Sequence, residues 1–319
     1  MSVDLSSQRI GVLFGGNSPE RAGSVASAEA AAKALSMEEP SVELIDLQGI
    51  DLGSLADRID VALLASHGLG GEDGKIQGAL DTLYIPYTGS GVKASAVGMH
   101  KLTVKRMATG AMIDTPRWVE VHPSHTTVTT VSMARQSLGF PVFVKPVSGG
   151  GSLEAAIARD EHELTAVLER TRTQPYAEYL IEEFVPGIPC SVGVLEVDGK
   201  LTTLPIHSAE TDREFYDYEA KHDRAQRRET CPADLPHLKA TRLSQLALRV
   251  HRLIGAHGLS RVDFLLDPCG RMPMLEINTV PGLSEHGNLA TMAAAAGMSY
   301  GDLVRHVLAT AFTKPAYVP

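Results

Sequence analysis

The sequence predicts an α/β protein in which strands and helices alternate along the chain. Near the N-terminus, two short apolar runs that end in glycine are each followed by a helix-forming segment, which is the pattern of parallel strands joined by helices. Further along, apolar runs and an amphipathic segment indicate a smaller α+β unit. With 319 residues, the chain is long enough to form two or three domains.

The first hundred residues contain two strand–loop–helix units. The run "RIGVLFGG" (9–16) predicts a strand with a glycine turn, and "SVASAEAAAKAL" (24–35) predicts the helix after it. The run "DVALLASHG" (60–68) predicts a second strand, and the loop "GLGGEDG" leads into a second helix, "KIQGALDTL" (75–83). We therefore expect residues 1–100 to form an N-terminal α/β domain with a parallel sheet.

The middle of the chain changes character. The runs "PVFVKPV" (141–147) and "YLIEEFV" (179–185) predict strands, and "DEHELTAVLERTR" between them predicts an amphipathic helix. We expect residues 101–189 to form a small central domain.

The last part begins with a polar segment at 207–236 that has little periodicity, and such a segment in a compact protein predicts a functional loop. The run at 239–258 predicts a helix, "RVDFLLD" and "RMPMLEIN" predict a strand hairpin around "PCG", and a final helix follows Met298. We expect residues 190–319 to form a C-terminal domain with a mobile loop at about residues 208–235.

Composition excludes several classes of protein. The net charge of −9 argues against a general nucleic-acid surface, although it allows a local basic pocket. The cysteines, Cys190, Cys231 and Cys269, contain no CxxC pair, so neither a disulfide framework nor a zinc knuckle is indicated. No apolar run approaches the roughly 18 residues of a membrane span, and no signal peptide is recognisable. We expect a cytoplasmic protein that binds neither membrane nor nucleic acid.

Three polar residues interrupt the apolar strands of the predicted hairpin. Asp263 lies in "RVDF", and Glu276 and Asn278 lie in "LEIN". Residues two apart on a strand share a face, and Asp263 can face them from the partner strand. Three hard oxygen ligands on one face suit Mg²⁺, which also takes water and phosphate oxygens. The alternative is a set of edge-strand charges that point into water.

The stretch "KPVSGGGSLE" has a lysine before its glycines. A Walker phosphate loop needs the lysine after the glycines, between a strand and a helix, so this pattern excludes that motif. Two hypotheses stay open from the residues alone. The stretch is either a glycine-rich loop that closes over a phosphate or a flexible hairpin connection with an exposed lysine.

The order and spacing of several motifs resemble the D-alanine:D-alanine ligase family of the ATP-grasp superfamily. These motifs are "LFGGNSPERAGSVAS", "SHGLGGEDGKIQGALDTLYIPYTGSGVKASAVGMHK", "FPVFVKPV", "EFYDYEAKH" and "SRVDFLLD…LEINTVPG". The resemblance covers nearly the whole chain. It implies an N-terminal domain that binds substrate and two ATP-grasp domains that clasp ATP between them. It also implies two Mg²⁺ ions, which Mn²⁺ can replace, amino-acid substrates and a homodimer.

The resemblance assigns residues to ATP. Lys101, Lys145 and Lys221 match the phosphate-binding lysines, and the "KPVSGGGS" loop matches the loop that closes over the γ-phosphate. Asp263, Glu276 and Asn278 match the magnesium ligands. The remaining positions matched to ATP binding are, for the adenine and its neighbourhood, Glu182, Phe184, Val185 and Tyr216, and, for the loop, Gly149, Gly150 and Gly151.

The resemblance also assigns residues to the reaction. Arg261 matches the arginine that steadies an acyl phosphate, and the backbone N–H of Gly282 matches the oxyanion donor. Glu20 matches the acid that holds the ammonium of the first D-alanine. The other positions matched to substrate binding or catalysis are Ser24, His67, Glu72, Ser152, His222 and Gly287.

Several positions depart from the family pattern. Gly151 replaces a serine that braces Glu20, and His222 replaces the tyrosine of the same triad. Gly287 replaces a serine that holds the carboxylate of the second substrate. The family's "ERxVS" becomes "ERAGS", an aspartate before the first phosphate lysine becomes His100, and a ribose-binding glutamate becomes Pro189. The departures place the identity of the acceptor and the nucleotide geometry in doubt.

Three hypotheses of function follow from these observations. The first is a D-alanine:D-alanine ligase for peptidoglycan precursors. The second is a specialised homologue that keeps the ADP-forming chemistry and joins another amino acid, hydroxy acid or amine in antibiotic biosynthesis or resistance. The third is a nucleotide-binding protein without catalysis, which the joint retention of the lysines, Arg261 and the magnesium ligands argues against.

Overall fold

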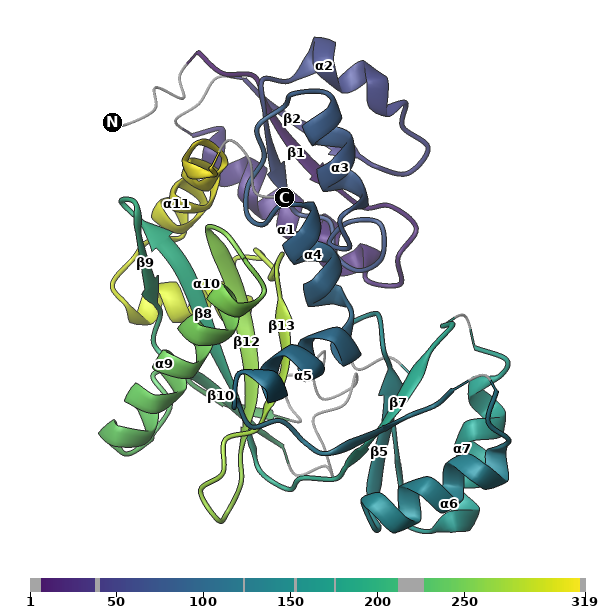
Figure 1. The fold of residues 1–319 in the computed structure, drawn as a ribbon. Helices are drawn as coiled ribbons and strands as arrows, with labels where there is room; N and C mark the ends of the chain where they lie inside the picture. Colours follow the sequence, from purple (N-terminus) through teal and green to yellow (C-terminus); the bar gives the residue numbers. More distant parts are fainter. Residues whose placement is uncertain are drawn as a thin grey trace.

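The computed structural model contains three β-sheets with helices packed on them (Figure 1). It describes residues 7–37, 41–122, 124–151, 154–174, 176–211 and 227–315. The strand–helix alternation near the N-terminus and the two further sheets confirm the predicted α/β class, with α+β character in the later part of the chain.

The N-terminal sheet is parallel and has the order β2–β1–β3. Its strands are β1 (Ile10–Phe14), β2 (Val42–Asp46) and β3 (Val61–Leu64). The helices and helical turns around it are α1 (Arg21–Leu35), η1 (Leu52–Ser54), α2 (Leu55–Arg58), α3 (Lys75–Thr82) and α4 (Val92–Met99). Alanines on one face allow α1 to lie close to the sheet, and both predicted strand–helix units are confirmed.

The largest sheet has six strands in the order β11–β10–β8–β12–β13, and the sixth strand, β9, pairs with β8. Its strands are β8 (Ile188–Val197), β9 (Lys200–Thr203), β10 (His207–Thr211), β11 (Arg227–Thr230), β12 (Leu259–Leu266) and β13 (Met274–Asn278). The helices associated with it are α5 (Lys101–Gly110), α9 (His237–Leu253), α10 (Asn288–Ala295) and α11 (Tyr300–Thr313). The long antiparallel pairing of β8 with β12 places the hairpin β12–β13 beside the middle of the sheet.

The third sheet is antiparallel, with the order β4–β7–β5–β6. Its strands are β4 (Trp118–Glu120), β5 (Val142–Pro146), β6 (Ala156–Ala158) and β7 (Tyr179–Glu183). The helices α6 (Thr127–Ser137) and α7 (Glu161–Thr171) cover it on one side, as Figure 1 shows. The predicted strands at 141–147 and 179–185 and the helix between them are confirmed.

The polar segment at 207–236 is not a loop throughout, so that prediction was wrong at its ends. Residues 207–211 form β10 and residues 227–230 form β11, and the two strands pair antiparallel. Polar residues on both faces of these strands remove the alternation by which a strand is recognised in a sequence. Residues 212–226 lie outside the described residues.

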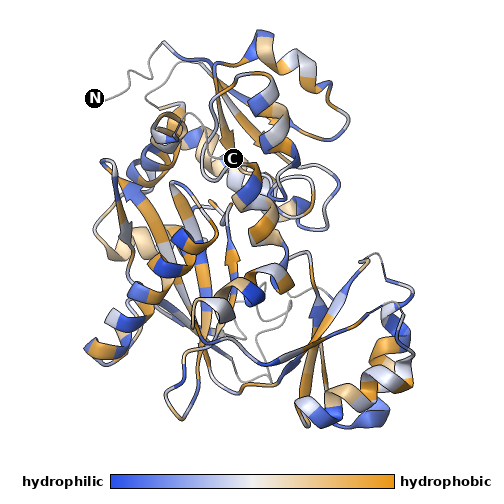
Figure 2. Cartoon of the chain, viewed as in Figure 1, coloured by the Kyte–Doolittle hydropathy of each residue, from blue (hydrophilic) through white to orange (hydrophobic). Residues whose placement is uncertain are grey.

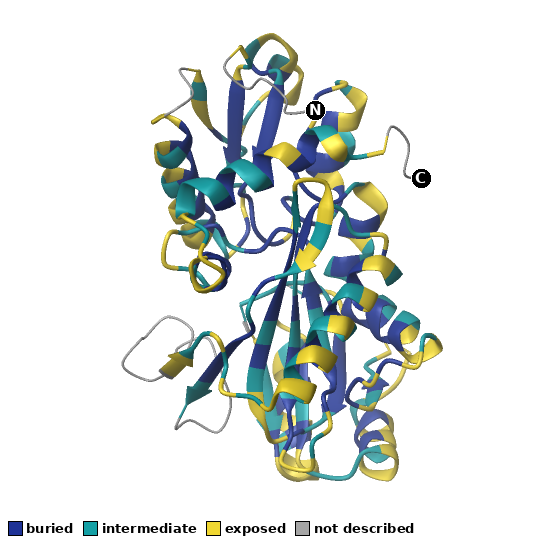
Figure 3. Cartoon of the chain, turned by 90° about the vertical axis from the view of Figure 1, so that its left-hand side faces the viewer, coloured by how far each residue is buried: buried dark blue, intermediate teal, exposed yellow. Residues whose placement is uncertain are grey.

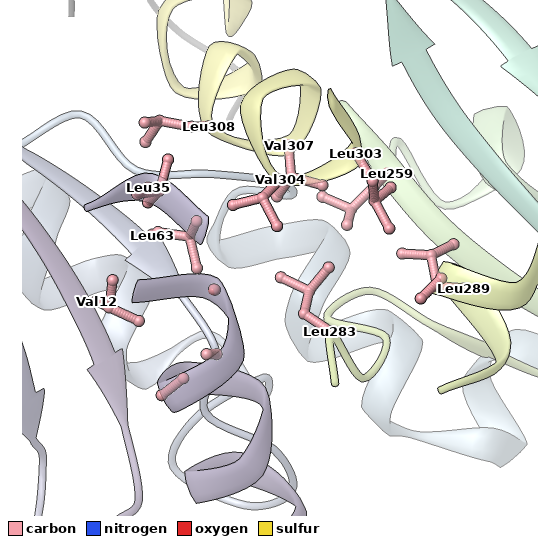
Figure 4. Close-up of a cluster of buried hydrophobic side chains, with 14 of the residues drawn as sticks. Val12, Leu35, Leu63, Leu259, Leu283, Leu289, Leu303, Val304, Val307 and Leu308 are labelled. Atoms are coloured by element: carbon pink, nitrogen blue, oxygen red, sulfur yellow. The ribbon is translucent and has the colours of Figure 1, made fainter. Parts of the chain in front are cut away.

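The N-terminal and C-terminal parts share one hydrophobic core. Side chains of α11 such as Val304 and Val307 lie near Leu35 of α1 and Leu63 of β3 (Figure 4). Leu283, from the loop after β13, lies in the same core. This packing fixes the N-terminal sheet beside the end of the hairpin β12–β13.

Burial follows the sheets. The central strands are apolar and largely buried, whereas the outer faces of the surrounding helices are hydrophilic and exposed (Figures 2 and 3). Val104 and Ala108 of α5 belong to the core cluster of the largest sheet, together with Phe264 of β12. No described helix has the length and apolar character needed to cross a membrane.

Acid should weaken this core through His251. The side chain is 2% exposed, and its Nδ1 lies 2.8 Å from Ser260 Oγ. Burial lowers the pKa of His251 to about 4, whereas an unfolded histidine titrates near 6.5. Between these pH values the unfolded chain binds more protons, so the free energy of unfolding should fall as the pH falls, by up to about 3 kcal/mol from this residue.

Denaturant unfolding at several pH values between 6.5 and 4 measures this dependence. His251→Gln should reduce the slope of the free energy of unfolding against pH by about one proton. The same change at His125, which is exposed, should leave the slope as in the wild type. An identical slope in wild type and His251→Gln would contradict the assignment of acid sensitivity to this side chain.

Candidate active site

A cavity of about 690 Å³ lies between the third sheet and the largest sheet, and it extends to the loops of the N-terminal sheet. Its walls come from strands β5, β7, β8, β10, β12 and β13, and Glu20 and His67 reach it from loops that follow β1 and β3. Apolar side chains such as Phe143 and Phe184 share the lining with lysines, an arginine and carboxylates. The cavity therefore combines an apolar surface with concentrated charge, as ligand sites commonly do.

The hairpin β12–β13 places four polar side chains together. Arg261 is opposite Asn278, and Asp263 is opposite Glu276 in the antiparallel register. Because side chains two residues apart share a face of a strand, the four groups lie on one face, and all four line the cavity. The predicted juxtaposition of Asp263 with Glu276 and Asn278 is present.

Arg261 and Asp263 form a two-point ion pair. Arg261 Nε lies 2.9 Å from Asp263 Oδ1, and Arg261 Nη2 lies 2.8 Å from Asp263 Oδ2. Ser191 of β8 also donates a hydrogen bond to Asp263 Oδ1, at 2.7 Å. Burial by itself would lower the pKa of Arg261, but the carboxylate of Asp263 more than offsets this, and the guanidinium stays charged.

The donor set suits a hard cation. Two carboxylates and one amide oxygen on a single face match the oxygen ligands of Mg²⁺. Asn278 Oδ1 accepts a hydrogen bond from Val280 N at 2.9 Å, which orients the amide. No group of three His, Cys, Asp or Glu side chains in the described ranges could hold a metal by itself. A cation here would thus complete its coordination with water or phosphate oxygens.

Glu182 of β7 lies between two lysines. Its carboxylate oxygens are 2.7 Å from Lys105 Nζ and 2.8 Å from Lys145 Nζ. Burial would raise the pKa of Glu182, but the two cations more than offset this and lower it. Lys145 lines the cavity, whereas Lys105 is fully buried behind it.

Lys105 is held by neutral groups as well as by Glu182. Its Nζ donates to Thr115 Oγ1 at 2.7 Å and lies 5.0 Å from the centre of the Trp118 ring. Burial lowers the pKa of Lys105 to about 8, and Glu182 opposes this shift. Lys105 is therefore the buried cation that keeps Glu182 compensated at neutral pH.

Lys101 connects the glycine-rich loop to the hairpin. Its Nζ lies 3.5 Å from Glu276 Oε2 and donates a hydrogen bond to the carbonyl oxygen of Gly149. Gly149 and Gly151 have φ values of +116° and +68°, which L side chains rarely adopt. Glycine at these positions allows the backbone to turn over the cavity next to Lys101 and Lys145.

His67 links helix α1 to the loop after β13. Its Nδ1 lies 3.0 Å from the carbonyl oxygen of Val280, and its Nε2 lies 3.0 Å from Ser27 Oγ. Because a carbonyl only accepts, Nδ1 carries the proton and Nε2 accepts from Ser27, whose oxygen accepts from Leu283 N at 3.1 Å. Burial lowers the pKa of His67 to about 4, so the ring is neutral and positions the loop that carries Gly282.

Glu72 is a buried acid on the loop after β3. Its Oε1 accepts a hydrogen bond from Gly68 N at 3.0 Å. Burial raises the pKa of Glu72 well above its ordinary value, and Glu20 nearby raises it further. An ammonium group placed beside Glu20 would relieve this repulsion, so the pair is suited to a cationic ligand group.

The cavity brings together most of the site residues predicted from the sequence. Those in its lining are Glu20, His67, Lys101, Lys145, Gly149, Gly150, Gly151, Glu182, Phe184, Val185, Arg261, Asp263, Glu276, Asn278, Gly282 and Gly287. Glu72 and Ser24 are buried behind it, and Ser24 Oγ donates to Ala65 O at 2.7 Å and accepts from Gly15 N at 2.7 Å. Ser152, Tyr216, Lys221 and His222 lie outside the described residues.

Sequence reasoning missed Lys105, Ser191 and Ser27, whose side chains hold the groups named above. Each lies on a helix or strand with ordinary periodicity, and nothing in its local sequence marks it as a partner of a site residue. The one available signal was weak: Lys105 falls on the apolar stripe of its helix, with Leu102 and Ala108.

The arrangement of three sheets, with a charged cavity between the last two, is that of an ATP-grasp protein. The family model described as D-ala D-ala ligase C-terminus matches residues 107–309, and the model described as D-ala D-ala ligase N-terminus matches residues 40–90. The chain belongs to the D-alanine–D-alanine ligase family.

Individual relatives agree with this assignment. A protein named D-alanine--D-alanine ligase from Methylococcus capsulatus is 37% identical over 310 residues, which cover 95% of this chain and 96% of that protein. The crystal structure of D-alanine--D-alanine ligase from Bacillus anthracis has a TM-score of 0.84 at 33% identity, covering 96% and 98% of the two chains. The structure of the Bacillus anthracis enzyme complexed with ATP has a TM-score of 0.79 at 30% identity and the same coverage.

Removing the buried cation should destabilise the protein. Lys105→Met would leave Glu182 compensated only by Lys145, and breaking a buried ion pair by removing one partner typically costs about 3 kcal/mol or more. Lys75→Met is the matched control, because the Lys75 side chain is 75% exposed and should contribute little. Denaturant unfolding at pH 7 measures both changes. Equal free energies of unfolding for the two variants would contradict the role given to Lys105.

Proposed function

We propose that the chain is an ATP-dependent, ADP-forming ligase that joins D-alanine to D-alanine for peptidoglycan precursors. The observation that carries the proposal is the cavity in which Lys101, Lys145 and Arg261 face the oxygen ligands of the hairpin β12–β13. Glu20 reaches the same cavity from the N-terminal domain. The names of the relatives and the ATP complex of one of them agree with this reading.

The charge and the apolar lining of the cavity suit ATP. The lysines Lys101 and Lys145 would neutralise phosphate oxygens, and backbone N–H groups of the loop at Gly149–Gly151 would approach them closely. Phe184 and Val185, on the chain between β7 and β8, supply an apolar surface for the adenine. Lys145 would then share its charge between Glu182 and a phosphate, while Lys105 keeps Glu182 paired.

Asp263, Glu276 and Asn278 would hold the Mg²⁺ ion that accompanies ATP. Bound there, the cation would neutralise charge that develops as the phosphoryl group transfers. The two carboxylates and the amide have the donor types that this role requires. Arg261 donates two hydrogen bonds to the carboxylate of Asp263. Mn²⁺ satisfies the same oxygen donors.

The reaction requires two transfers. A carboxylate oxygen of the first D-alanine attacks the γ-phosphorus of ATP, the bond to the bridging oxygen breaks, and ADP leaves. The amine of the second D-alanine, once deprotonated, attacks the carbonyl carbon of the acyl phosphate, and phosphate leaves with the former carboxylate oxygen. Arg261 would steady the acyl phosphate, and the N–H of Gly282 would donate to the oxyanion.

The first substrate's ammonium is assigned to Glu20, with Glu72 as the buried acid behind it. His67 would act by holding the loop that carries Gly282, since both of its ring nitrogens are already bonded. Ser24 would act likewise on the loop after β1, through its bonds to Gly15 and Ala65.

The relatives, which are named D-alanine--D-alanine ligase, do not favour a specialised ligase with a different acceptor, but one position at the acceptor end departs from the family pattern. Gly287 stands where the family's serine would hold the carboxylate of the second substrate. A Cβ at Gly287 would lie 2.9 Å from Ser284 Oγ, so Ser284 fills part of the space of the missing side chain. The acceptor end of the cavity therefore differs from the family pattern, and acceptors must be compared directly.

ADP release by the purified protein tests both candidates. With ATP, Mg²⁺ and D-alanine, we expect ADP and phosphate in equal amounts and D-alanyl-D-alanine by mass spectrometry. D-serine, D-lactate and simple amines, each offered with D-alanine as the donor, test the second candidate. Formation of AMP, or no nucleotide turnover with any of these substrates, would overturn the proposal.

Asp263→Asn and Glu276→Gln test the metal assignment. Each change weakens a proposed ligand of Mg²⁺ with little change in shape, so ADP release should fall by about a hundredfold or more while the fold is retained. Asp234→Asn, at an exposed position of the same region, is the control and should keep wild-type turnover. Normal turnover in both ligand variants at constant Mg²⁺ would refute the assignment.

Other features remain predictions from the sequence. These are the division into domains at 1–100, 101–189 and 190–319, the mobility of the part of the predicted loop between β10 and β11, the homodimer and the cytoplasmic location. The roles given to Tyr216, Lys221, Ser152 and His222 belong with them. Size-exclusion chromatography with light scattering would test the homodimer.

A further inference from the structure

Two side chains from different parts of the chain lie close to the glycine-rich loop. A Cβ built on Gly149 would lie 2.8 Å from Cε1 and 3.4 Å from Cζ of the Tyr176 ring. A Cβ built on Gly150 would lie 2.9 Å from both carboxylate oxygens of Glu20. Real Cβ atoms do not approach other atoms this closely, so a side chain at Gly149 would displace the Tyr176 ring, and one at Gly150 would displace the carboxylate end of Glu20.

Tyr176 packs against the core of the third sheet. It lies three residues before Tyr179, the first residue of β7, and the two rings meet edge to face with centroids 6.3 Å apart. Tyr179 is 4% exposed and belongs to the core of the third sheet, against which Tyr176 also packs. The Tyr176 ring is therefore anchored to the sheet rather than to the loop that it touches.

Glu20 comes from a part of the chain distant in sequence from both the loop and Tyr176. It precedes α1 in the N-terminal domain, whereas the loop and Tyr176 belong to the third sheet and its connections. The contact between Gly150 and the Glu20 carboxylate is therefore a contact between two domains, made without a side chain on the loop. A shift of the loop backbone changes the space at this carboxylate directly.

The charge environment of Tyr176 agrees with this geometry. Burial raises the pKa of the Tyr176 phenol, and the carboxylates of Glu20 and Glu154 raise it further. The phenol is thus neutral and lies within the electrostatic field of Glu20. A neutral ring can pack against the loop without adding a charge that would compete with a substrate ammonium for the Glu20 carboxylate.

We propose that Tyr176 is a positioning residue for the first-substrate site: its ring holds the backbone of Gly149 and so sets how closely Gly150 lies over the carboxylate of Glu20. The inference rests on the proposed function, in which Glu20 binds the ammonium of the first D-alanine. The loop position in this chain lacks the serine that the family pattern places at Gly151, and the Tyr176 ring supplies a support from the other face of the loop.

Steady-state kinetics of ADP release against D-alanine concentration separates the two substrate sites. Tyr176→Ala should raise the KM of the first D-alanine by about tenfold or more, because a misplacement of order 1 Å at a binding group has effects of this size. The KM of the second D-alanine should stay within about twofold. Tyr176→Phe keeps the ring and should restore the wild-type KM to within about twofold.

A loop-side variant tests the same contact independently. Gly149→Ala introduces the Cβ that would meet the ring, and it should also raise the KM of the first D-alanine. The Tyr176→Ala variant lacks the ring, so in that variant Gly149→Ala should raise the KM of the first D-alanine by at most about half as much as it does alone. An alanine at position 149 is strained by the positive φ with or without the Tyr176 ring, so part of the increase in KM should remain.

Tyr84→Ala is the matched control, since Tyr84 is 93% exposed in the N-terminal domain and should leave both KM values unchanged. Any of three results would overturn the inference. The first is an unchanged KM for the first D-alanine in Tyr176→Ala, and the second is a Tyr176→Phe variant as impaired as Tyr176→Ala. The third is strict additivity of the effects of Gly149→Ala and Tyr176→Ala. Absence of ADP release in the wild type would instead overturn the proposed function, so the two failures are distinguishable.

Discussion

The pairing of ionised side chains on the walls of one cavity is the constraint on which the rest of the site depends. An unpaired charge in such a place costs several kcal/mol, so each cation must meet a carboxylate with good geometry. Glu182 satisfies Lys105 and Lys145 together, and Asp263 satisfies Arg261. The pairs of Glu182 connect β5, β7 and α5, and the pair of Asp263 with Arg261 orients two side chains of β12. The pairs therefore restrict the positions of these strands and of helix α5.

The same constraint prepares the site for an anionic ligand. Lysines and an arginine that are already oriented need little rearrangement when phosphate oxygens arrive, which is the electrostatic preorganisation that phosphoryl transfer requires. Lys105 matters here although it does not line the cavity. Because it compensates Glu182 from behind, Lys145 can direct its charge to a phosphate without leaving a buried carboxylate unpaired. Neutral His67 has a structural role, since its hydrogen bonds connect the loop that carries Gly282 to helix α1.

Local patterns in the sequence predicted the features that depend on local geometry. The period of two along a strand was enough to place Glu276 and Asn278 on one face. The glycines after a strand-ending lysine indicated a loop but did not decide between a phosphate-covering loop and a flexible hairpin connection. Partners distant in the chain left no such signal. The burial of Lys105 depends on Glu182, and the contact of Tyr176 with Gly149 depends on how the third sheet folds. The strands β10 and β11 were missed because polar residues on both of their faces hide the alternation.

If this cavity activates a carboxylate as an acyl phosphate, an oxygen atom must pass from the substrate to the released phosphate. D-alanine labelled with ¹⁸O in its carboxylate is incubated with ATP, Mg²⁺ and the protein, and the released phosphate is analysed by mass spectrometry. We expect one ¹⁸O atom in the phosphate for each dipeptide formed, because the carboxylate oxygen that attacks the phosphorus leaves with it. Unlabelled phosphate accompanying dipeptide formation, or label in AMP instead, would contradict activation through an acyl phosphate.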